Sequence, residues 1–470
     1  MARTASGGQA IRLPGSVPAS LILGLWAAAI ASAPSLTWKL ALAAPALLLP
    51  AALWTIEKPG RWVAAFLATA LLLPPLPIAL GDTGPHVCLL FAALGLLAGL
   101  LRLPCWGVPA TPLTCALGAL ALVLLASVAP AAILSGAVPA AGSLARVGLF
   151  GVAVYLFFYT AYGPGRETGS AASIRALYWA GAAAALFACV DFYFQFPAPA
   201  GYGPQFVWLD SGVYRRAQGF FYEASTLGNF CAFFLVMIAV ALSRPRGDTP
   251  VSRKALAAGG ALFLGALVLS YSRSSLGNVT VAGAVLVWQN RKRIRFARLL
   301  APLAVFGALG GLAIWKIFPA FVENYWLRLT NSATYLFSST EGVLSGRLAN
   351  WETLTAWIAA HPWQALVGIG YKTLPYTDYL GAPVIGDNMY LSLFVETGIA
   401  GLAALLWLHV AILRSAARAS RRSDKLASFC GTWMLGFWAG QAVQMLSADL
   451  LTFWRVLPLY FWVLALAVRE

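Results

Sequence analysis

The stretch that decides the fold is residues 112–134, which read PLTCALGALALVLLASVAPAAIL. It contains no Asp, Glu, Lys or Arg, and its length as an α-helix is enough to cross a hydrocarbon core of roughly 30 Å. Other apolar runs of about 17 to 25 residues, the length of a membrane span, recur along the chain. The sequence therefore predicts an all-α, polytopic integral membrane protein.

The composition supports this class. Of the 470 residues, 60% are hydrophobic and only 10% are charged, whereas about a quarter of the residues in a soluble domain are charged. The six cysteines form no C-x-x-C pair, so the sequence suggests neither a zinc site nor a disulfide framework. These observations exclude a soluble globular enzyme.

About fourteen transmembrane helices are expected. We place them at residues 16–34, 36–55, 62–80, 86–101, 112–134, 146–163, 174–194, 225–243, 255–272, 274–289, 299–317, 389–413, 427–447 and 451–468.

Positive charge predicts the orientation of these helices. Three short linkers, at residues 244–254, 291–298 and 414–425, are rich in Lys and Arg, which favours the cytoplasmic side. Both termini then lie inside, and the net charge of +16 reflects topology and contact with anionic membrane lipids. A nucleic-acid partner is not expected. Two long loops, 195–223 and 319–387, face outward, and the second, with short helices such as 346–360, precedes the twelfth helix.

Four arginines lie on the predicted outer face. They are Arg215, Arg216, Arg273 and Arg347. Arg273 has almost no loop to occupy, and an arginine near membrane depth is costly unless it is paired or faces a polar cavity. Guanidinium groups bind phosphate with two parallel charge-assisted hydrogen bonds, so a converging set of them suits a diphosphate.

Two carboxylates accompany these arginines, Glu223 and Asp387. Either could accept a proton from a hydroxyl nucleophile, and either could instead be the N-cap of the helix that follows it. Arg347 could likewise pair only with Glu352. The outer loops contain no D-x-D pair, so we expect neither a metal nor another cofactor. The combination suits glycosyl transfer from a lipid-linked diphosphate sugar.

Five motifs, in this order, resemble the O-antigen ligase and polymerase superfamily of bacterial envelope enzymes. They are Arg216-x-x-Gly219-x-Phe221-x-Glu223-Ala-Ser225; Ser272-Arg273-Ser274; Ser345-Gly346-Arg347-x-x-x-Trp351; His361-Pro362 with Gly368-x-Gly370; and Asp387-Asn388-x-Tyr390 with Glu396-Thr-Gly398.

The resemblance implies a metal-independent glycosyltransferase with a GT-C-like fold in the bacterial inner membrane, acting at the periplasmic face. It covers residues 214–413, so we divide the chain into N-terminal helices, 1–163, and a ligase/polymerase-like domain, 164–470. Arg216, Arg273 and Arg347 would handle the diphosphate of an undecaprenyl-diphosphate-linked glycan donor. Supporting roles are expected for three further residues, Asn388, Tyr390 and His361.

The sequence departs from the ligase pattern at Asp387, where ligases carry a histidine. This departure favours a polymerase that joins lipid-linked repeat units into O-antigen or exopolysaccharide, with a glycan acceptor. A ligase that transfers the glycan to lipid A-core or protein is the alternative, and a lipid-linked glycan transporter or flippase is an alternative of another class. A separate flippase and a chain-length regulator are candidate partners.

Overall fold

The computed structural model of the chain describes residues 16–76, 85–199, 202–209, 212–245, 248–291 and 347–469, together with residues 315, 316, 319, 322, 323, 325–327 and 330. The chain forms two compact units, Met1–Arg61 and Trp62–Glu470. The division at residues 163 and 164, which follows the extent of the family resemblance, stays a prediction.

The first unit contains two helices, α1 (Ser16–Ser32) and α2 (Leu36–Glu57). Ser35 caps α2, because its hydroxyl oxygen accepts a hydrogen bond from the backbone N–H of Trp38 at 3.3 Å. The indole of Trp26 in α1 donates to the backbone carbonyl of Leu42 at 2.8 Å. This bond joins the two helices, whose bounds agree with the predicted ones to within two residues.

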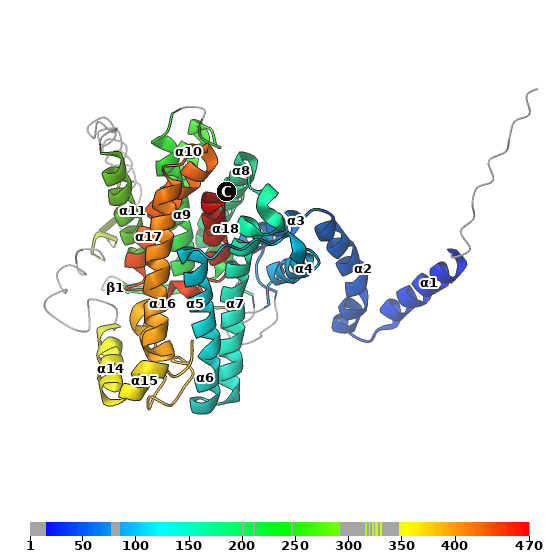
Figure 1. The fold of residues 1–470 in the computed structure, drawn as a ribbon, viewed down its shortest axis with the longest axis horizontal. Coiled ribbons are helices and arrows are strands. Elements are labelled where there is room, and N and C mark those ends of the chain that lie inside the picture. The colour runs from blue at the N-terminus through cyan, green and yellow to red at the C-terminus, as the bar shows by residue number, and fades with distance from the viewer. Residues whose placement is uncertain are drawn as a thin grey trace, which may run out of the picture. The chain divides into compact units, whose positions relative to one another are not determined.

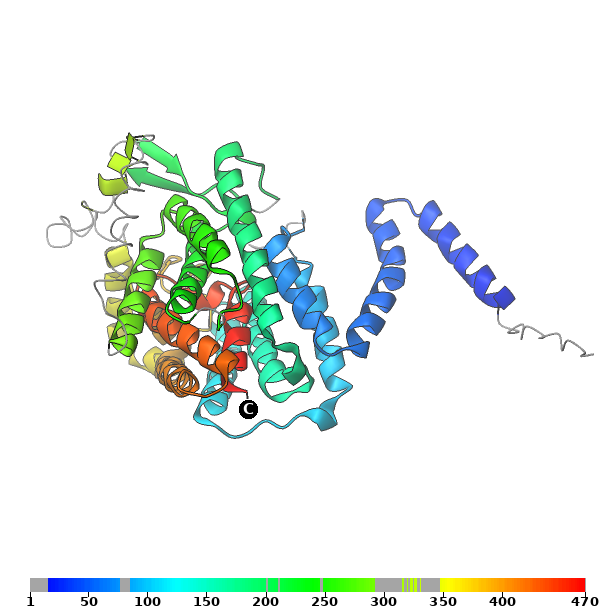
Figure 2. The same ribbon diagram turned by 90° about the horizontal axis from the view of Figure 1, so that it is seen from above.

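The second unit is a bundle of helices with one short strand hairpin (Figures 1 and 2). Its α-helices are α3 (Arg61–Leu72), α4 (Cys88–Leu100), α5 (Pro112–Ala126), α6 (Val128–Leu134), α7 (Ala137–Tyr162), α8 (Ala171–Phe194), α9 (Ala224–Leu242), α10 (Arg253–Leu269), α11 (Arg273–Asn290), α14 (Arg347–Ala360), α15 (Pro362–Val367), α16 (Met389–Ala419), α17 (Lys425–Gln444) and α18 (Leu457–Val468). The 3-10 turns are η1 (Leu103–Cys105), η2 (Pro164–Thr168), η3 (Gly219–Phe221) and η5 (Leu450–Thr452), and the antiparallel strands are β1 (Phe206–Leu209) and β2 (Gly212–Arg215).

Several described segments can cross a membrane by their length and composition. Five are long enough: Pro112–Leu134, Ala137–Tyr162, Ala171–Phe194, Ala224–Leu242 and Met389–Ala419. Shorter apolar helices accompany them, among them Cys88–Leu100 and Leu457–Val468. The prediction of a polytopic helical membrane protein is therefore confirmed, while the number fourteen stays a prediction. The expected span 299–317 falls almost entirely outside the described residues.

The structure differs from several predicted elements. The predicted helix 62–80 ends at Leu72, because Pro74 and Pro75 follow it, and the predicted helix 389–413 continues to Ala419. Three further differences concern helix starts and the first outer loop. First, α7 begins at Ala137, nine residues before the predicted 146, because the small residues that precede the apolar run include several alanines, the best helix formers. Second, the first outer loop is not all irregular, since β1 and β2 pair there through aromatic and β-branched residues. Third, α18 begins at Leu457 and not at 451, because the preceding segment forms η5 and a loop that carries Arg455.

The core of the second unit surrounds α18. This helix is buried along almost its whole length and contacts α7, α16 and α17. A helix that is apolar on every face needs neighbours on every side. Phe233 of α9 fills the space between α17 and α18, with its ring centroid 4.2 Å from Trp433 and 4.6 Å from Tyr460. This core holds the ends of α9, α16 and α17 in fixed positions.

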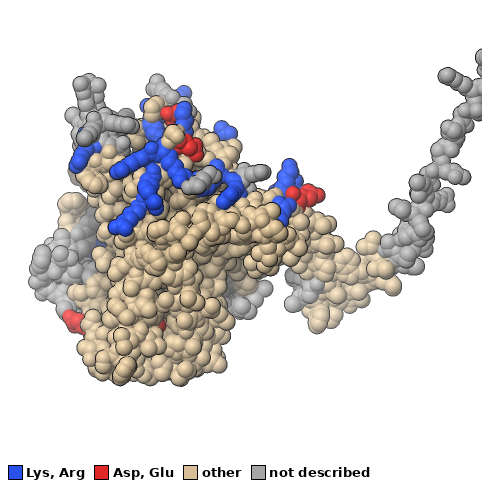
Figure 3. Space-filling model, in the orientation of Figure 1, with Lys and Arg blue, Asp and Glu red and all other residues tan. Residues whose placement is uncertain are grey.

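The helices alternate in direction, and this sorts their ends onto two faces. The segments that follow α9, α11 and α16 are basic, and so are the first residues of α10 and α17. Figure 3 shows Lys and Arg gathered at this end of the second unit and few charges at the end where α14 and α15 lie. The starts of α9, α11 and α16 therefore belong to the face opposite the basic one.

Candidate functional site

An ion pair joins the start of α14 to the loop before α16. The Nε–H of Arg347 donates to Oδ2 of Asp387 at 2.9 Å. Two further bonds hold α14 to the same loop: Trp351 Nε1 donates to the Gly386 carbonyl at 2.6 Å, and Asn350 Nδ2 donates to the Ile385 carbonyl at 2.8 Å. The loop therefore fixes Arg347, which pairs with Asp387, 40 positions away, and not with Glu352.

Arg216 lies beside the turn that carries Arg273. Its Nε–H donates to the backbone carbonyl of Ser270 at 2.8 Å, and the next residue, Ala217, donates its N–H to the Leu269 carbonyl at 2.9 Å. Burial lowers the pKa of Arg216 to about 10; Glu223 raises this pKa, and Arg347 and Arg273 lower it. Three of the four predicted diphosphate-binding arginines, 216, 273 and 347, thus lie close enough for their charges to influence one another.

Glu223 stands directly before α9 and belongs to the same group. The Thr226 hydroxyl donates to its Oε2 at 2.6 Å, and its side chain makes no capping bond to the helix. Burial raises the pKa of the Glu223 carboxyl; Thr226 and Arg216 lower it, Asp387 raises it and Lys372 lowers it. The two predicted carboxylates are therefore neighbours, in the electrostatic field of the arginines.

The sequence reasoning missed Lys372. Its ammonium pairs with Asp449, and burial lowers its pKa, while Glu396 raises that pKa and Arg146 lowers it. The loop that carries Lys372 is docked on α16, since the Gly370 N–H donates to the Glu396 carbonyl at 2.8 Å. One signal was available: Lys372 follows the Gly368-x-Gly370 motif by two residues.

Backbone strain is concentrated at this site. Among the described residues, five that are not glycine have a positive φ: Gln195, Tyr222, Tyr271, Lys372 and Asp387. Lys372 and Asp387 are themselves site residues. Tyr222 stands directly before Glu223, and Tyr271 stands two residues before Arg273. Such conformations cost on the order of 1–3 kcal/mol each and persist where the surroundings impose them, often at functional sites.

A buried amide network supports the turn of Arg273 from the core. The hydroxyl oxygens of Ser272 and Ser275 lie 2.8 Å apart, and Nε2 of Gln444 in α17 donates to the Ser275 hydroxyl oxygen at 3.0 Å. Asn229 of α9 donates to the Gln444 carbonyl oxygen at 2.9 Å and accepts from the Tyr460 hydroxyl at 2.6 Å. Side chains of α9, α11, α17 and α18 thereby fix the backbone at Arg273.

Four predicted site residues have other partners. Arg215 Nη2 lies 3.6 Å from Asp191 Oδ1 of α8. Tyr390 donates to the Ala442 carbonyl at 2.7 Å. His361 stacks on Trp357 with ring centroids 4.5 Å apart, at the opposite end of α14 from Arg347, roughly 20 Å away along the helix. Asn388 is the N-cap of α16, a role that had been considered for Asp387. Ser345 and Gly346 of the third motif lie outside the described residues.

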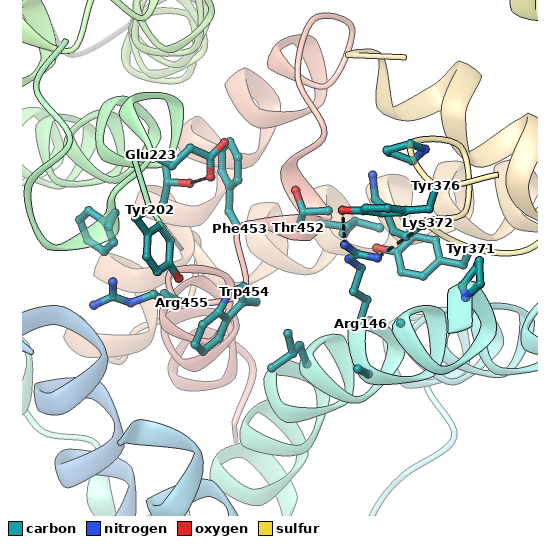
Figure 4. A pocket seen from close by; sticks show the side chains of 18 of the residues that line it. Arg146, Tyr202, Glu223, Tyr371, Lys372, Tyr376, Thr452, Phe453, Trp454 and Arg455 are labelled. Carbon is teal, nitrogen blue, oxygen red and sulfur yellow. Dashed lines mark hydrogen bonds between the residues drawn. The ribbon is translucent and has the colours of Figure 1, made fainter. Parts of the chain in front are cut away.

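A cavity of about 920 Å³ opens beside Glu223. It is bounded by α7, by the loop around Lys372 and by residues 451–455, and Figure 4 shows Glu223 toward one end and Arg146 toward the other. Arg146 Nη2 donates to the Tyr376 hydroxyl at 2.7 Å. The cavity is lined by Val138, Pro139, Gly142, Ala145, Arg146, Leu149, Tyr202, Phe221, Glu223, Thr226, Tyr371, Lys372, Pro375, Tyr376, Leu451, Thr452, Phe453, Trp454 and Arg455.

The fold and the site together define a polytopic helical membrane protein with clustered arginines and carboxylates at the face opposite its basic linkers. Residues 258–406 match the model of a protein family described as O-antigen ligase. The match confirms the predicted resemblance to the O-antigen ligase/polymerase superfamily for this part of the chain. The matched range contains Arg273, Arg347 and Asp387 and leaves out Arg216 and Glu223. A comparison with curated proteins finds no match.

Proposed function

We propose that the protein polymerises undecaprenyl-diphosphate-linked oligosaccharide repeat units into O-antigen or exopolysaccharide. The observation that carries the proposal is the group of charges at this face. Arg216 donates to the carbonyl of Ser270 in the turn before Arg273, Arg347 pairs with Asp387, and these charges and Glu223 influence the pKa values of Arg216 and Glu223. Three cations beside a carboxylate suit a reaction in which a diphosphate leaving group gains negative charge while a hydroxyl loses its proton.

The arginines would hold the diphosphate of the donor. Arg216 keeps its charge at neutral pH, because its pKa, though lowered by burial, is still about 10. Arg347 and Arg273 each lower the pKa of Arg216 because like charges repel, and a diphosphate bound among them would offset this repulsion. The charge that develops on the leaving group needs no metal ion in this arrangement.

Glu223 would be the base. The acceptor hydroxyl oxygen bonds to the anomeric carbon of the donor sugar, the bond from that carbon to the diphosphate oxygen breaks, and the hydroxyl proton passes to the Glu223 carboxylate. The diphosphate leaves with the electron pair. Asp387 is less suited to this task, since Arg347 already donates to it at 2.9 Å. We assign Asp387 the positioning of Arg347.

The orientation follows from the basic linkers. Their position favours the cytoplasmic side for that face, which puts Glu223 and the arginines at the periplasmic face of an inner membrane. The chain's C-terminal region agrees, because Arg422 in the basic linker donates to the Arg469 carbonyl at 2.8 Å. A GT-C-like fold fits a helical glycosyltransferase of this kind.

A ligase is the second candidate, because the matched family is described as O-antigen ligase. Asp387 argues against a ligase, because it stands where ligases carry a histidine and it forms an ion pair with Arg347. A polymerase and a ligase differ only in the acceptor, so the same donor chemistry serves both.

The test is a glycan profile of a strain that lacks the protein and is complemented with wild type or with Arg273→Ala. A polymerase predicts that single lipid-linked repeat units accumulate in the deletion and in the variant, while the variant protein remains in the membrane. Long polymer that stays on undecaprenyl diphosphate in the deletion strain would replace the polymerase with the ligase. Normal polymer in the Arg273→Ala strain would contradict the proposal that this arginine group binds the diphosphate.

A further inference from the structure

The cavity beside Glu223 has two ends of different character. Glu223, which accepts a hydrogen bond from Thr226, belongs to one end, and Arg146, Lys372 and Tyr376 belong to the other (Figure 4). Arg216, Arg273, Arg347 and Asp387 are not among its lining residues. Glu223 therefore stands between the arginine group on one side and this cavity on the other.

The lining combines flat aromatic surfaces with polar groups. Tyr202, Tyr376 and Trp454 each present a ring with a polar tip, and Arg146, Glu223 and other hydrogen-bonding side chains lie between them. A saccharide has this same dual character, since its C–H faces are apolar and its hydroxyls donate and accept hydrogen bonds. The volume of about 920 Å³ also lies within the roughly 300–1,000 Å³ typical of ligand sites.

The aromatic rings are held in place before any ligand binds. The Arg146 guanidinium carbon lies 4.8 Å from the ring centroid of Tyr376, whose hydroxyl accepts from the same guanidinium. The Tyr202 ring centroid is 5.1 Å from that of Tyr222, and Trp454 meets His86 edge to face. Rings that are already fixed lose little side-chain entropy when a glycan binds.

The loop with Trp454 is anchored by Arg455. The guanidinium of Arg455 donates to the carbonyls of Ala70 and Leu73 at the end of α3 and to that of Phe220 before α9. Arg455 therefore joins the loop with Trp454 to the end of α3 and to η3 at the wall of the cavity. These hydrogen bonds fix the position of this part of the cavity wall.

We propose that this cavity binds the acceptor saccharide, with the attacking hydroxyl at Glu223 and the remaining sugars extending toward Arg146 and Tyr376. This inference rests on the proposed function. It gives donor and acceptor separate approaches to one carboxylate: the diphosphate from the arginine side and the hydroxyl from the cavity side. The proposed occupant is the sugar portion of the acceptor, because charged and hydroxyl side chains line the cavity at both ends, between apolar residues.

The experiment uses the full-length protein in lipid vesicles with the lipid-linked repeat unit as donor. The acceptor probe is the same oligosaccharide as a methyl glycoside, which carries no diphosphate and cannot serve as donor. The variants are Arg146→Ala and Tyr376→Ala. The matched control is Tyr379→Ala, because Tyr379 is also exposed in this loop but contacts Gln364 and Trp357 and does not line the cavity.

We expect the KM for the methyl glycoside to rise roughly tenfold or more in both cavity variants. We expect kcat within about twofold of wild type, an unchanged KM for the donor, and no effect of the control. Direct binding of the methyl glycoside should weaken in parallel, which gives a readout that does not depend on turnover.

An unchanged KM for the glycoside in both variants would overturn the acceptor site while leaving the enzyme intact. A raised KM for the lipid-linked donor alone would overturn it in favour of a polyprenyl chain. If the wild-type protein neither extends the glycoside nor releases undecaprenyl diphosphate, the proposed function is wrong, and the acceptor site is wrong with it.

Discussion

Arg347 Nε lies 2.9 Å from Asp387 Oδ2, and this ion pair connects two residues that the sequence offered for separate tasks, one for binding diphosphate and one for catalysis. Because the guanidinium occupies this carboxylate, we propose that Asp387 orients the arginine and that Glu223 accepts the proton. Among the described residues, the Glu223 carboxylate accepts a hydrogen bond only from the Thr226 hydroxyl. The five predictions below follow from these roles and from the packing that maintains them.

Replacing Asp387 by Asn should reduce polymerisation by about ten- to a hundredfold, because Asn keeps the shape but weakens the hold on Arg347. The measurement is polymer yield per molecule of protein in vesicles. In a double-mutant cycle, Arg347→Ala with Asp387→Asn should be no worse than Arg347→Ala alone. Fully additive losses would mean that Asp387 acts on the substrate itself.

Glu223→Gln should lower the polymerisation rate by roughly a hundredfold or more, the usual contribution of a general base. Since burial raises the pKa of Glu223 above its ordinary value of 4.5, the wild-type rate should climb with pH through that raised pKa, and the variant should lack this limb.

The stability of the protein should respond to the same titration. A raised pKa means that the folded protein holds the proton more tightly than the unfolded chain, so Glu223 lowers stability as the pH rises above 4.5 and through the raised pKa. Melting curves at several pH values should therefore show that Glu223→Gln is at least as stable as wild type at neutral pH. A strongly destabilised variant would contradict the assignment.

Two adjacent arginines should behave differently on substitution. Arg216→Ala removes a member of the diphosphate group and should cost at least about a hundredfold in rate, with a smaller change in melting temperature. Arg215→Ala leaves the Asp191 carboxylate without its partner and should cost more in stability than in rate. Parallel rate and melting measurements separate the two. Equal rate losses would place Arg215 in the substrate site as well.

Gly228→Ala tests the support of the Arg273 turn. A Cβ at Gly228 would lie 2.7 Å from Ser272 Cβ and 2.8 Å from Ser275 Oγ, so the turn must shift. We expect a loss of about 1–3 kcal/mol in stability, as for other overpacked positions, together with reduced polymerisation.

The matched control for this change is Gly265→Ala in α10, where a Cβ would have nothing within 4 Å. Alanine in a helix interior is favoured over glycine by roughly 0.5–1 kcal/mol, so this variant should be as stable as wild type or slightly more stable. Normal activity in Gly228→Ala would show that the position of the Arg273 turn tolerates the shift.

The sequence by itself determined the class of fold and most of the site's members. Apolar runs such as 112–134 can only be membrane-spanning or buried helices, because an unpaired backbone in hydrocarbon is too costly. The sequence also predicted a short helix at residues 346–360 within the second outer loop, and the described helix α14 is Arg347–Ala360. Arg216, Arg273 and Glu223 also stood out in the sequence, since a charge is rare in so apolar a chain.

Only the tertiary structure decided which charges meet. The pairing of Arg347 with Asp387, of Arg215 with Asp191, and of Lys372 with Asp449 depends on loops and helix ends that are 24 to 77 positions apart, and residue spacing carries no information about such contacts. The cavity beside Glu223 is equally invisible in the sequence, because α7, residues 371–376 and residues 451–455 form it jointly. Helix formation is a local property of the chain, whereas the partner of a charge is set by packing among distant segments.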